Sequence, residues 1–398
     1  MHGGNPSPKS TSATVPPGKP SEEPALQDEV VHSGLENIVS HESSISSIIG
    51  ATLTYRGINI DELAENATFE EVIALLWNGE LPRKQALGDL KSALRQEFRL
   101  PEGVIRVLRT FPKDAEPMRA LQAIMAVLGF FDPDRDDNSD AANRRKAVRI
   151  TPQLSAVTCA FHRIRSGKDP VAPRSDLDFA ANFFWNLHGR EPKPIELESI
   201  DKALVLHADH ELNASTFSAR VTASTLADMH TALSAAIGTL KGPLHGGANR
   251  AVMETLQQIG SVEKVEPWLD SVLGRKEKVM GFGHRVYKQG DPRAKHLKTL
   301  SRELGELTKQ PQWYRMSELL EKLVLDKKKL LPNVDFYSAS VYYSLGIPPD
   351  LYTPIFACSR VVGWIAHLFE QYAANDLIRP RAKYTGPQEA HWVPLEKR

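Results

Sequence analysis

Histidine and aspartate gather in a short segment where a purely structural helix would hold neither. It runs from Leu206 to Glu211, and its His207 and His210 are spaced i, i+3, so on a helix they share one face. With Asp209 and Glu211 beside them, these histidines could bind a metal ion or a small anion. A polar helix end is the structural alternative, and the spacing alone leaves all three open.

A second segment, Lys241 to Asn249, holds His245 in a glycine-rich turn directly ahead of a helical run at Arg250 to Gln258. The N-terminus of a helix offers free N–H groups and a positive potential. This placement disfavours a charged imidazolium and favours a neutral imidazole that donates a hydrogen bond. A glycine-rich connector without chemistry is the alternative.

A third segment, Gly281 to Lys288, combines glycines that let the backbone approach a ligand with the donor His284. Arginine and lysine follow in a cluster suited to carboxylate or phosphate: Arg285, Lys288 and Arg293. A dinucleotide fingerprint does not fit, because no strand precedes the segment and its third glycine is absent. A solvated basic loop remains the alternative.

The fourth stretch contains Asp335 between apolar and aromatic neighbours, where burial could raise its pKa and make it a useful base. Arg360 lies inside an apolar helix expected over Tyr352 to Phe369. An unpaired charge there would be costly, so Arg360 needs an anionic partner, either the substrate or a structural salt bridge. Farther on, Arg379 belongs to an Arg-Pro-Arg motif.

The elements that must position these side chains read as helices, and the sequence predicts an all-α fold. Thr68 and Glu71 form a capping-box pattern for a helix that ends at Asn78-Gly79. Residues 132–145 are expected to be a loop or an exposed helix start. No β-alternating stretch lasts long enough to build a sheet of any size. Other helices are expected at Met118 to Leu128, Ala156 to Ile164, Leu177 to Leu187 and, as one long or two consecutive helices, at 214–237.

Length and composition limit the class of protein. A chain of 398 residues with 41% hydrophobic content can bury a large core, divided between two domains. Lys+Arg and Asp+Glu both number 49, so no general attraction to nucleic acid or an anionic membrane follows. The two cysteines, Cys159 and Cys358, are expected to be packing residues in a reducing, cytoplasmic compartment.

The first 29 residues are rich in Pro, Ser, Gly and Lys with almost no large apolar side chain, which predicts a disordered tail over residues 1–29. This start also lacks the basic and apolar regions of a secretory signal. No apolar run approaches the roughly 20 residues that cross a bilayer. We therefore expect the protein to stay in the cytoplasm.

Taken together and in order, these segments resemble the citrate synthase family from about Ser33 to Gly386. The motifs are His-Ala-Asp-His-Glu-Leu-Asn-Ala-Ser, Gly-Pro-Leu-His-Gly-Gly-Ala-Asn, Gly-Phe-Gly-His-Arg-Val-Tyr-Lys with Asp-Pro-Arg, Asn-Val-Asp-Phe-Tyr and Arg-Pro-Arg. The resemblance implies a multi-helical homodimer. Its large domain would span residues 30–246 and 345–398, and a smaller mobile domain residues 247–344, with the active site between them.

The resemblance also implies the chemistry, condensation of acetyl-CoA with oxaloacetate and hydrolysis of citryl-CoA to citrate and CoA. Asp335 would take a proton from the acetyl-CoA methyl group. His245 would stabilise the resulting enol or enolate at the thioester oxygen. His284 would polarise the oxaloacetate ketone.

Substrate binding follows from the same resemblance. His210, Arg293 and Arg360 would hold the oxaloacetate carboxylates, and Arg379 would reach in from the partner subunit. Lys288 and Arg285 would bind CoA phosphates. The family uses no metal and no cofactor, and acetyl-CoA is a substrate. Oxaloacetate is expected to bind first, because it closes the mobile domain and keeps water from the intermediate.

Three other functions compete with this interpretation. 2-Methylcitrate synthase shares the motifs and uses propionyl-CoA, and one methylene is worth only about 1 to 3 kcal/mol in an apolar pocket. A metal-dependent hydrolase would use His207, His210 and Asp209. A helical scaffold would keep the fold without catalysis. The chain lacks the β-rich N-terminal extension of NADH-regulated hexameric relatives, so that control is not expected.

Overall fold

The computed structural model describes residues 30–35, 38–284, 286–287 and 289–398. The tail expected over 1–29 therefore lies outside the described residues. Two compact units are distinguished, one from Glu42 to Arg379 and the other comprising the chain up to His41 and from Pro380 onward. The candidate site residues, from His207 to Arg379, belong to the first unit.

The first unit is built almost entirely from α-helices, which confirms the all-α prediction. Their bounds are α1 Ile60–Asn66, α2 Phe69–Asn78, α3 Lys84–Gln96, α4 Glu102–Thr110, α5 Pro117–Phe131, α6 Asp140–Arg165, α7 Phe179–His188, α8 Pro194–His207, α9 Ala214–Ser224, α10 Met229–Leu240, α11 Ala248–Ile259, α12 Val265–Gly274, α13 Ala294–Leu307, α14 Gln312–Lys328, α15 Val334–Ser344 and α16 Tyr352–Ala373.

The expected helices are present, with some boundaries moved. Thr68 and Glu71 form the predicted capping box at the start of α2, and Gly79 ends that helix in the left-handed region with a φ of 88°. The charged stretch 132–145 contains the true start of α6, which Ser139 caps and which continues through Pro152 to include the helix expected at Ala156. Residues 214–237 form two helices, α9 and α10.

A small sheet was not expected from the sequence. Strands β1 Ser46–Ile49, β2 Thr52–Tyr55 and β3 Ile58–Asn59 form an antiparallel meander in that order. The strands are only two to four residues long, too short for a clear alternating pattern. Burial of Leu53 and Tyr55 on one face of β2 anchors the sheet to the helical core.

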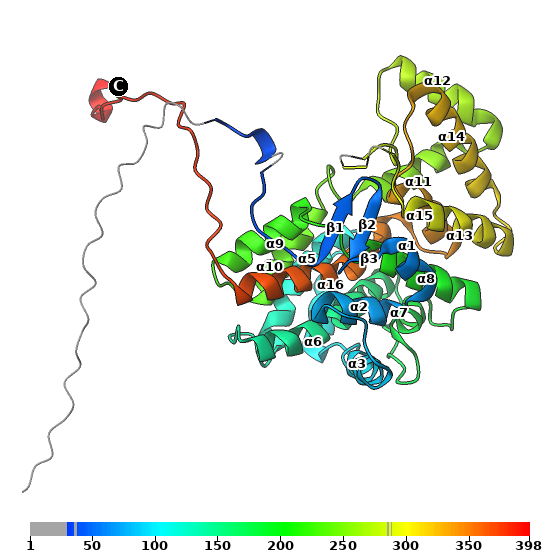
Figure 1. The fold of residues 1–398 in the computed structure, drawn as a ribbon, viewed down its shortest axis with the longest axis horizontal. Helices are drawn as coiled ribbons and strands as arrows, with labels where there is room; N and C mark the ends of the chain where they lie inside the picture. The colour runs from blue at the N-terminus through cyan, green and yellow to red at the C-terminus, as the bar shows by residue number, and fades with distance from the viewer. Residues whose placement is uncertain (1–29, 36–37, 285, 288) are drawn as a thin grey trace, which may run out of the picture. The chain divides into compact units, whose positions relative to one another are not determined.

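Helix α16 is the main element of the core. It contacts α2, α6, α8, α9 and α10, and Figure 1 shows it running among these helices. Its side chains are buried along nearly the whole length, including Trp364 at 0% exposure. A helix buried on all sides has no solvent face for a charge, so Arg360 on α16 points to a function within the interior.

Helices α11 to α15 form a second group. Figure 1 shows them gathered on one side, where α15 packs against both α13 and α11, and α14 packs against α12 and α13. Asn333 caps α15 by accepting a hydrogen bond from the Asp335 backbone N–H at 3.1 Å. Within the residues described, no helix is both long and apolar enough to cross a membrane.

Candidate active site

The loop that carries His284 is joined by hydrogen bonds to the segment that carries Asp335. Backbone N–H groups of Gly283 and Asn333 donate to the carbonyls of Leu331 and Gly281, each at 2.9 Å. The Asn333 side chain donates to the Gly283 carbonyl at 3.0 Å. Two motifs about fifty residues apart in the sequence thus lie against each other at the start of α15.

Asp335 has the properties of a base held out of water. Its Oδ1 is buried without a hydrogen-bond partner among the described residues. Burial raises the pKa of Asp335 to about 6, against the opposing effect of the positive charge on Arg293 and Arg360. An unpaired carboxylate oxygen with a pKa near neutrality can accept a proton from a weak carbon acid.

His245 is held as a neutral hydrogen-bond donor. The backbone N–H of Ser215 lies 3.3 Å from its Nε2, and Ser215 Oγ lies 2.9 Å from the same atom. Because a backbone N–H can only donate, Nε2 is the acceptor and Nδ1 carries the ring proton. Burial, helped by the nearby charge of Arg360, lowers the pKa of His245 to about 4.

The turn that carries His245 depends on Gly246. The Gly246 N–H donates to the Leu240 carbonyl at 3.0 Å, and a Cβ at this position would lie 2.4 Å from that oxygen. Only glycine allows this approach. The Gly246 carbonyl in turn accepts from Thr353 Oγ1 on α16 at 3.0 Å, which ties the turn to the core.

His284 and His210 meet at Tyr287. The rings of His284 and His210 have centroids 5.2 Å apart, and the Tyr287 hydroxyl is 3.1 Å from His210 Nε2. Backbone N–H groups of Val286 and Tyr287 donate to His284 Nδ1 at 3.0 and 3.2 Å. Nδ1 is therefore the acceptor, and Nε2 carries a proton that can be donated to a ligand.

Arg360 is a buried cation with no carboxylate in direct contact in the described part of the chain, although the charge of Asp209 acts on it from farther away. It is 2% exposed, its Nε donates to the His207 carbonyl at 2.7 Å, and its guanidinium lies over the Phe356 ring at 4.7 Å. No carboxylate among the described residues forms an ion pair with it. Burial lowers the pKa of Arg360 to about 10. A bound carboxylate would supply the missing charge.

Arg293 is the second buried cation, and it is paired within the chain. Its Nε and Nη2 donate to Asp291 Oδ1 and Oδ2 at 2.9 and 2.8 Å. Asp291 Oδ2 also accepts from the Val334 N–H at 3.0 Å. Burial opposes both charges, but the pairing outweighs it and raises the pKa of Arg293 while lowering that of Asp291. Asp291 thereby fixes Arg293 beside the start of α15.

In the segment from Leu206 to Glu211, for which a metal site, an anion site and a polar helix end were the alternatives, His207 and Asp209 are structural supports. His207 is fully buried, its Nδ1 lies 2.7 Å from the Ala203 carbonyl, and burial lowers its pKa to about 3. Asp209, also fully buried, accepts a hydrogen bond from Ser46 and lies 3.4 Å from His367 Nε2. Throughout the described ranges, no group of three or more His, Cys, Asp or Glu side chains could hold a metal ion.

Close packing of α16 fixes the same segment. A Cβ at Gly363 would lie 2.3 Å from the Ala208 carbonyl oxygen, so the helix can approach only with glycine there. The Tyr55 hydroxyl of β2 accepts from the Asp209 N–H at 3.2 Å. The small sheet and α16 together hold the backbone that carries His210.

Arg360 links the groups that the structure brings together. Its positive charge acts on His245, His210 and Asp335, and Arg293 acts on the last two. Arg379 follows α16 as an exposed residue, and its place in a partner's site stays a prediction. Arg285 and Lys288 lie outside the described residues.

Several supporting residues were not identified from the sequence. Asn213 caps α9, accepts from Ser215 Oγ at 2.7 Å, and so orients the serine that contacts His245. Trp364 Nε1 donates to the same hydroxyl at 3.1 Å. Two short patterns in the sequence could have indicated such supports. One is the Asn-x-Ser spacing at Asn213, ahead of a helix, and the other is the Asp-x-Arg spacing that begins at Asp291.

This arrangement can remove a proton from carbon and stabilise the charge that develops. A base with a raised pKa, two neutral histidines that each present an N–H, and two buried guanidinium groups suit condensation between a carbon acid and an anionic carbonyl compound.

Comparison with known proteins gives consistent matches over nearly the whole chain. The family model described as "Citrate synthase, C-terminal domain" matches residues 34–381. Citrate synthase 2 of Bacillus subtilis is 54% identical over 366 residues, which cover 92% of this chain and 98% of that protein. 2-Methylcitrate synthase 1 of Corynebacterium glutamicum is 38% identical over 380 residues, covering 94% and 100%.

The fold is similar to that of solved structures. A citrate synthase from the thermophilic archaeon Thermoplasma acidophilum, solved in a ternary complex with carboxymethyl coenzyme A and oxaloacetate, matches with a TM-score of 0.87 and 33% sequence identity. The match covers 92% of this chain and 99% of that chain.

Proposed function

The chain belongs to the citrate synthase family, and from that membership we propose that it condenses acetyl-CoA with oxaloacetate and hydrolyses citryl-CoA to citrate and CoA. The observation that carries the proposal is Asp335, whose buried Oδ1 lacks a partner among the described residues and whose pKa is raised to about 6. A catalytic base needs both a free lone pair and a pKa near the working pH.

In the first step Asp335 takes a proton from the methyl group of acetyl-CoA. The electron pair moves toward the thioester oxygen, which gains negative charge. His245 Nδ1–H donates to that oxygen, and a buried neutral imidazole with a pKa of about 4 remains a donor without first losing a proton. No metal or cofactor enters this step.

In the second step the enol carbon attacks the ketone of oxaloacetate. His284 Nε2–H polarises the ketone and donates to the alkoxide that forms. Arg360, whose charge has no partner among the described carboxylates, binds one substrate carboxylate. Arg293 uses Nε and Nη2 for Asp291, which leaves Nη1 for substrate, and His210 donates beside it.

Citryl-CoA must then be hydrolysed, while acetyl-CoA must not be. We assign this control to closure of a small domain, residues 247–344, onto a large domain, residues 30–246 and 345–398. Contacts between α1 and α13 support such an arrangement. Lys295 Nζ and His296 Nε2 lie 2.6 and 2.7 Å from the carboxylate of Asp61. These pairs would form or break as the domains move.

CoA binding is assigned to Arg285 and Lys288, which follow His284 in the sequence. A homodimer is supported by large apolar side chains exposed near the C-terminus: Leu377 at 61%, Tyr384 at 68%, Trp392 at 77% and Leu395 at 73%. Arg379 lies within this stretch and would enter the partner's active site. A cytoplasmic location is part of the same proposal.

Subunit mixing tests the assignment of Arg379. Chains bearing Arg379→Ala and chains bearing Asp335→Asn should each be nearly inactive. After exchange, about a quarter of the parental activity should return, since half of the dimers are hybrids and each hybrid restores one of two sites. If Arg379 acts in its own chain, no hybrid site is complete and the mixture stays inactive.

The alternative substrate is propionyl-CoA, as the name of the Corynebacterium relative at 38% identity indicates. The higher identity to citrate synthase 2 of Bacillus subtilis, 54%, favours acetyl-CoA. The deciding measurement is thiol release with each acyl-CoA at several oxaloacetate concentrations. We expect kcat/KM for acetyl-CoA to exceed that for propionyl-CoA by about 10- to 200-fold, the effect of one methylene.

The same data test the order of binding. Initial rates should fit an ordered scheme with oxaloacetate first, because closure completes the CoA site. Random-order kinetics would contradict closure, and a preference for propionyl-CoA would contradict the acyl assignment. A helical scaffold would release no thiol with either substrate. A metal-dependent hydrolase would lose its activity to a chelator, whereas this enzyme should retain it.

A further inference from the structure

Asp61 in the first turn of α1 joins this helix to the first turn of α13. Its Oδ2 accepts a hydrogen bond from Lys295 Nζ at 2.6 Å, and its Oδ1 accepts from His296 Nε2 at 2.7 Å. A carboxylate can only accept, so Nε2 of His296 carries a proton. Helix α8 packs against both α1 and α13, and Figure 1 shows the three helices together where the group α11 to α15 meets the rest.

Lys295 and His296 are unfavourably placed for their own helix. Helix α13 begins at Ala294, and its first turn contains no acidic residue. The N-terminus of a helix carries a positive partial charge, which disfavours cations there. Asp61 lies at the N-terminus of α1 and supplies a negative charge that both helix ends favour. Two basic residues that oppose their own helix indicate that they serve the contact with α1.

The contact is partly shielded from water. The side chain of His296 is 8% exposed, that of Asp61 29% and that of Lys295 60%. Burial disfavours the charge of Asp61, but the hydrogen bonds from Lys295 and His296 outweigh this effect and lower the pKa of Asp61. Asp61 is therefore ionised at neutral pH.

The surroundings of the contact are polar. A hollow of about 410 Å³ lies between α1, α8 and α13, and charged side chains from all three helices line it, including Glu65, Glu198, Lys202 and Glu303. Opening such an interface exposes little apolar surface, so its cost is small. The spacing of α1 and α13 therefore depends on polar contacts such as those of Asp61.

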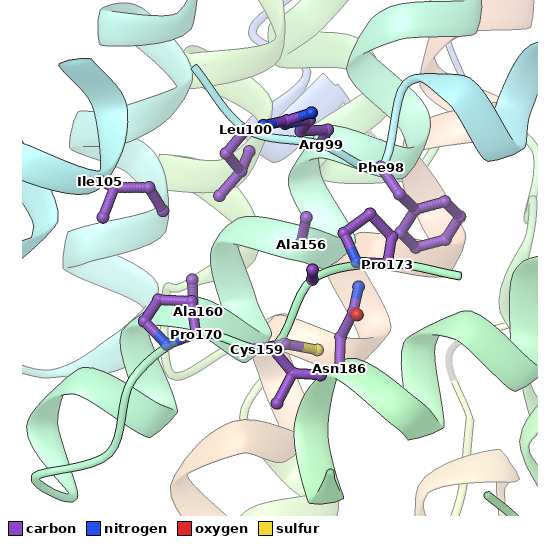
Figure 2. Close-up of a pocket in the computed structure, with 12 residues that line it drawn as sticks. Phe98, Arg99, Leu100, Ile105, Ala156, Cys159, Ala160, Pro170, Pro173 and Asn186 are labelled. Atoms are coloured by element: carbon purple, nitrogen blue, oxygen red, sulfur yellow. The ribbon is translucent and has the colours of Figure 1, made fainter. Parts of the chain in front are cut away.

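The other hollow of the helical unit that Figure 2 shows has no part in this contact. It lies beside α4, α6 and α7, with Arg99 and Asn186 among its lining residues. Its lining contains no residue of α1 or α13.

The first turn of α13 is connected to groups assigned to the reaction. Arg293 directly precedes Ala294 and is bound by Asp291, whose Oδ2 also accepts from the Val334 N–H at 3.0 Å. Asp335 follows Val334 on α15. A shift of α13 relative to α1 would therefore move Arg293 and Asp335 together.

The groups that face these two residues belong to other elements. The charge of Arg293 acts on Tyr55 of β2 and on His210, and the charge of Arg360 on α16 acts on Asp335. These interactions across the two groups of helices depend on the spacing at which Asp61 meets α13.

We propose that Asp61 is a positioning residue for the assigned reaction. By binding Lys295 and His296 it favours the spacing of α1 and α13 at which Arg293 and Arg360 hold the same oxaloacetate molecule. Asp61 acts through Arg293 and does not touch the substrate. The inference rests on the proposed function and names a contact that stabilises the closed arrangement.

Asp61→Asn tests the role of the charge, because the amide has nearly the same shape as the carboxylate. The Kd of oxaloacetate, measured by calorimetry without acetyl-CoA, should rise about three- to tenfold as the competent arrangement becomes less populated. Saturating oxaloacetate restores that arrangement, so kcat for thiol release should change by less than about twofold.

Two variants accompany this measurement. Asp61→Glu keeps the carboxylate and should stay within about twofold of the parent in both quantities. Glu62→Gln is the control, because Glu62 is an exposed acid in the same turn of α1. It should leave both quantities unchanged.

Lys295→Gln and His296→Gln test the pairing. Each should raise the Kd of oxaloacetate in the parent chain and add little in Asp61→Asn, where the shared partner is already lost. Asp61→Lys places a like charge against Lys295 and should raise the Kd by at least about tenfold. Adding Lys295→Asp should lower it again by at least about threefold. Additive effects or no recovery would overturn the proposal.

The remaining outcomes also decide. Unchanged oxaloacetate affinity in Asp61→Asn, even with a lower melting temperature, would mark Asp61 as purely structural and overturn the proposal. A loss of kcat without a loss of affinity would do the same. If Asp61→Asn fails to fold, Lys295→Gln and His296→Gln in the parent chain still decide. A parent chain that releases no thiol would instead contradict the proposed function.

Discussion

Replacing Asp335 with Asn should lower kcat by about 10²- to 10⁴-fold and leave oxaloacetate affinity unchanged. The amide has nearly the same shape as the carboxylate but cannot take a proton from the acetyl-CoA methyl group. We assign oxaloacetate binding to Arg360, Arg293 and His210 instead. Thiol-release kinetics measure kcat, and calorimetry measures the affinity for oxaloacetate in the absence of acetyl-CoA.

The matched control is Asp326→Asn, an exposed carboxylate on α14. It should leave both quantities unchanged.

Asp335→Asn should also unfold at no lower temperature than the parent at pH 7. Because the pKa of Asp335 is raised in the folded state, its protonated form contributes to the free energy of unfolding. This contribution is fully present below about pH 4 and is lost as the pH rises through about 6. Asparagine does not ionise, so the variant does not lose stability in this way.

The pH dependence of the parent enzyme gives an independent measurement. Because the base must be ionised, kcat/KM should rise tenfold per pH unit below about 6 and level off above it. In Asp335→Asn the remaining activity should not show this rise of kcat/KM with pH. If the variant keeps more than a tenth of the activity, or shows the same rise, another group is the base.

Replacing His245 with Ala should lower kcat by about 10²- to 10³-fold, the usual cost of removing one donor to a developing oxyanion. The buried imidazole presents its Nδ1–H because Ser215 occupies Nε2. Without this donor, charge on the thioester oxygen is left unstabilised and proton removal by Asp335 becomes harder. KM for oxaloacetate should change little, because we assign His245 to the thioester of acetyl-CoA.

Ser215→Ala gives a graded test of the same interaction. It removes the hydroxyl but keeps the backbone N–H that also contacts Nε2, so a loss of roughly fivefold in kcat is expected. His391→Ala, an exposed histidine near the C-terminus, is the control for His245→Ala. Loss of oxaloacetate affinity in His245→Ala without loss of kcat would contradict the assigned role.

Much of the local structure could be predicted because it depends on nearby residues. The capping box at Thr68 and the stop at Gly79 are local patterns, and both are present. The charged stretch 132–145 was expected to be a loop or an exposed helix start, and it contains both. Residues 132–139 precede the helix, and α6 begins at Asp140 with a partly exposed first turn and buried later turns.

The small sheet could not be predicted from local sequence patterns. Its strands have two to four residues, and their pairing depends on the antiparallel register of Ser46 with Tyr55 rather than on a pattern within any one strand. Nothing in the sequence alone showed that the hydroxyls of Ser46 and Tyr55 would reach Asp209.

The sequence by itself determined which side chains are available for chemistry: Asp335, His245, His284 and the arginines stand in motifs with a recognisable order. Residue type sets what a group can donate or accept, and the motifs set which family it resembles. Only the tertiary structure decided how those groups behave. The tautomers of His245 and His284 depend on backbone N–H groups that approach from Ser215 and from Val286. The raised pKa of Asp335 and the lone charge of Arg360 depend on burial, because exclusion of water changes the free energy of a charge and is a property of the packed molecule, not of a segment.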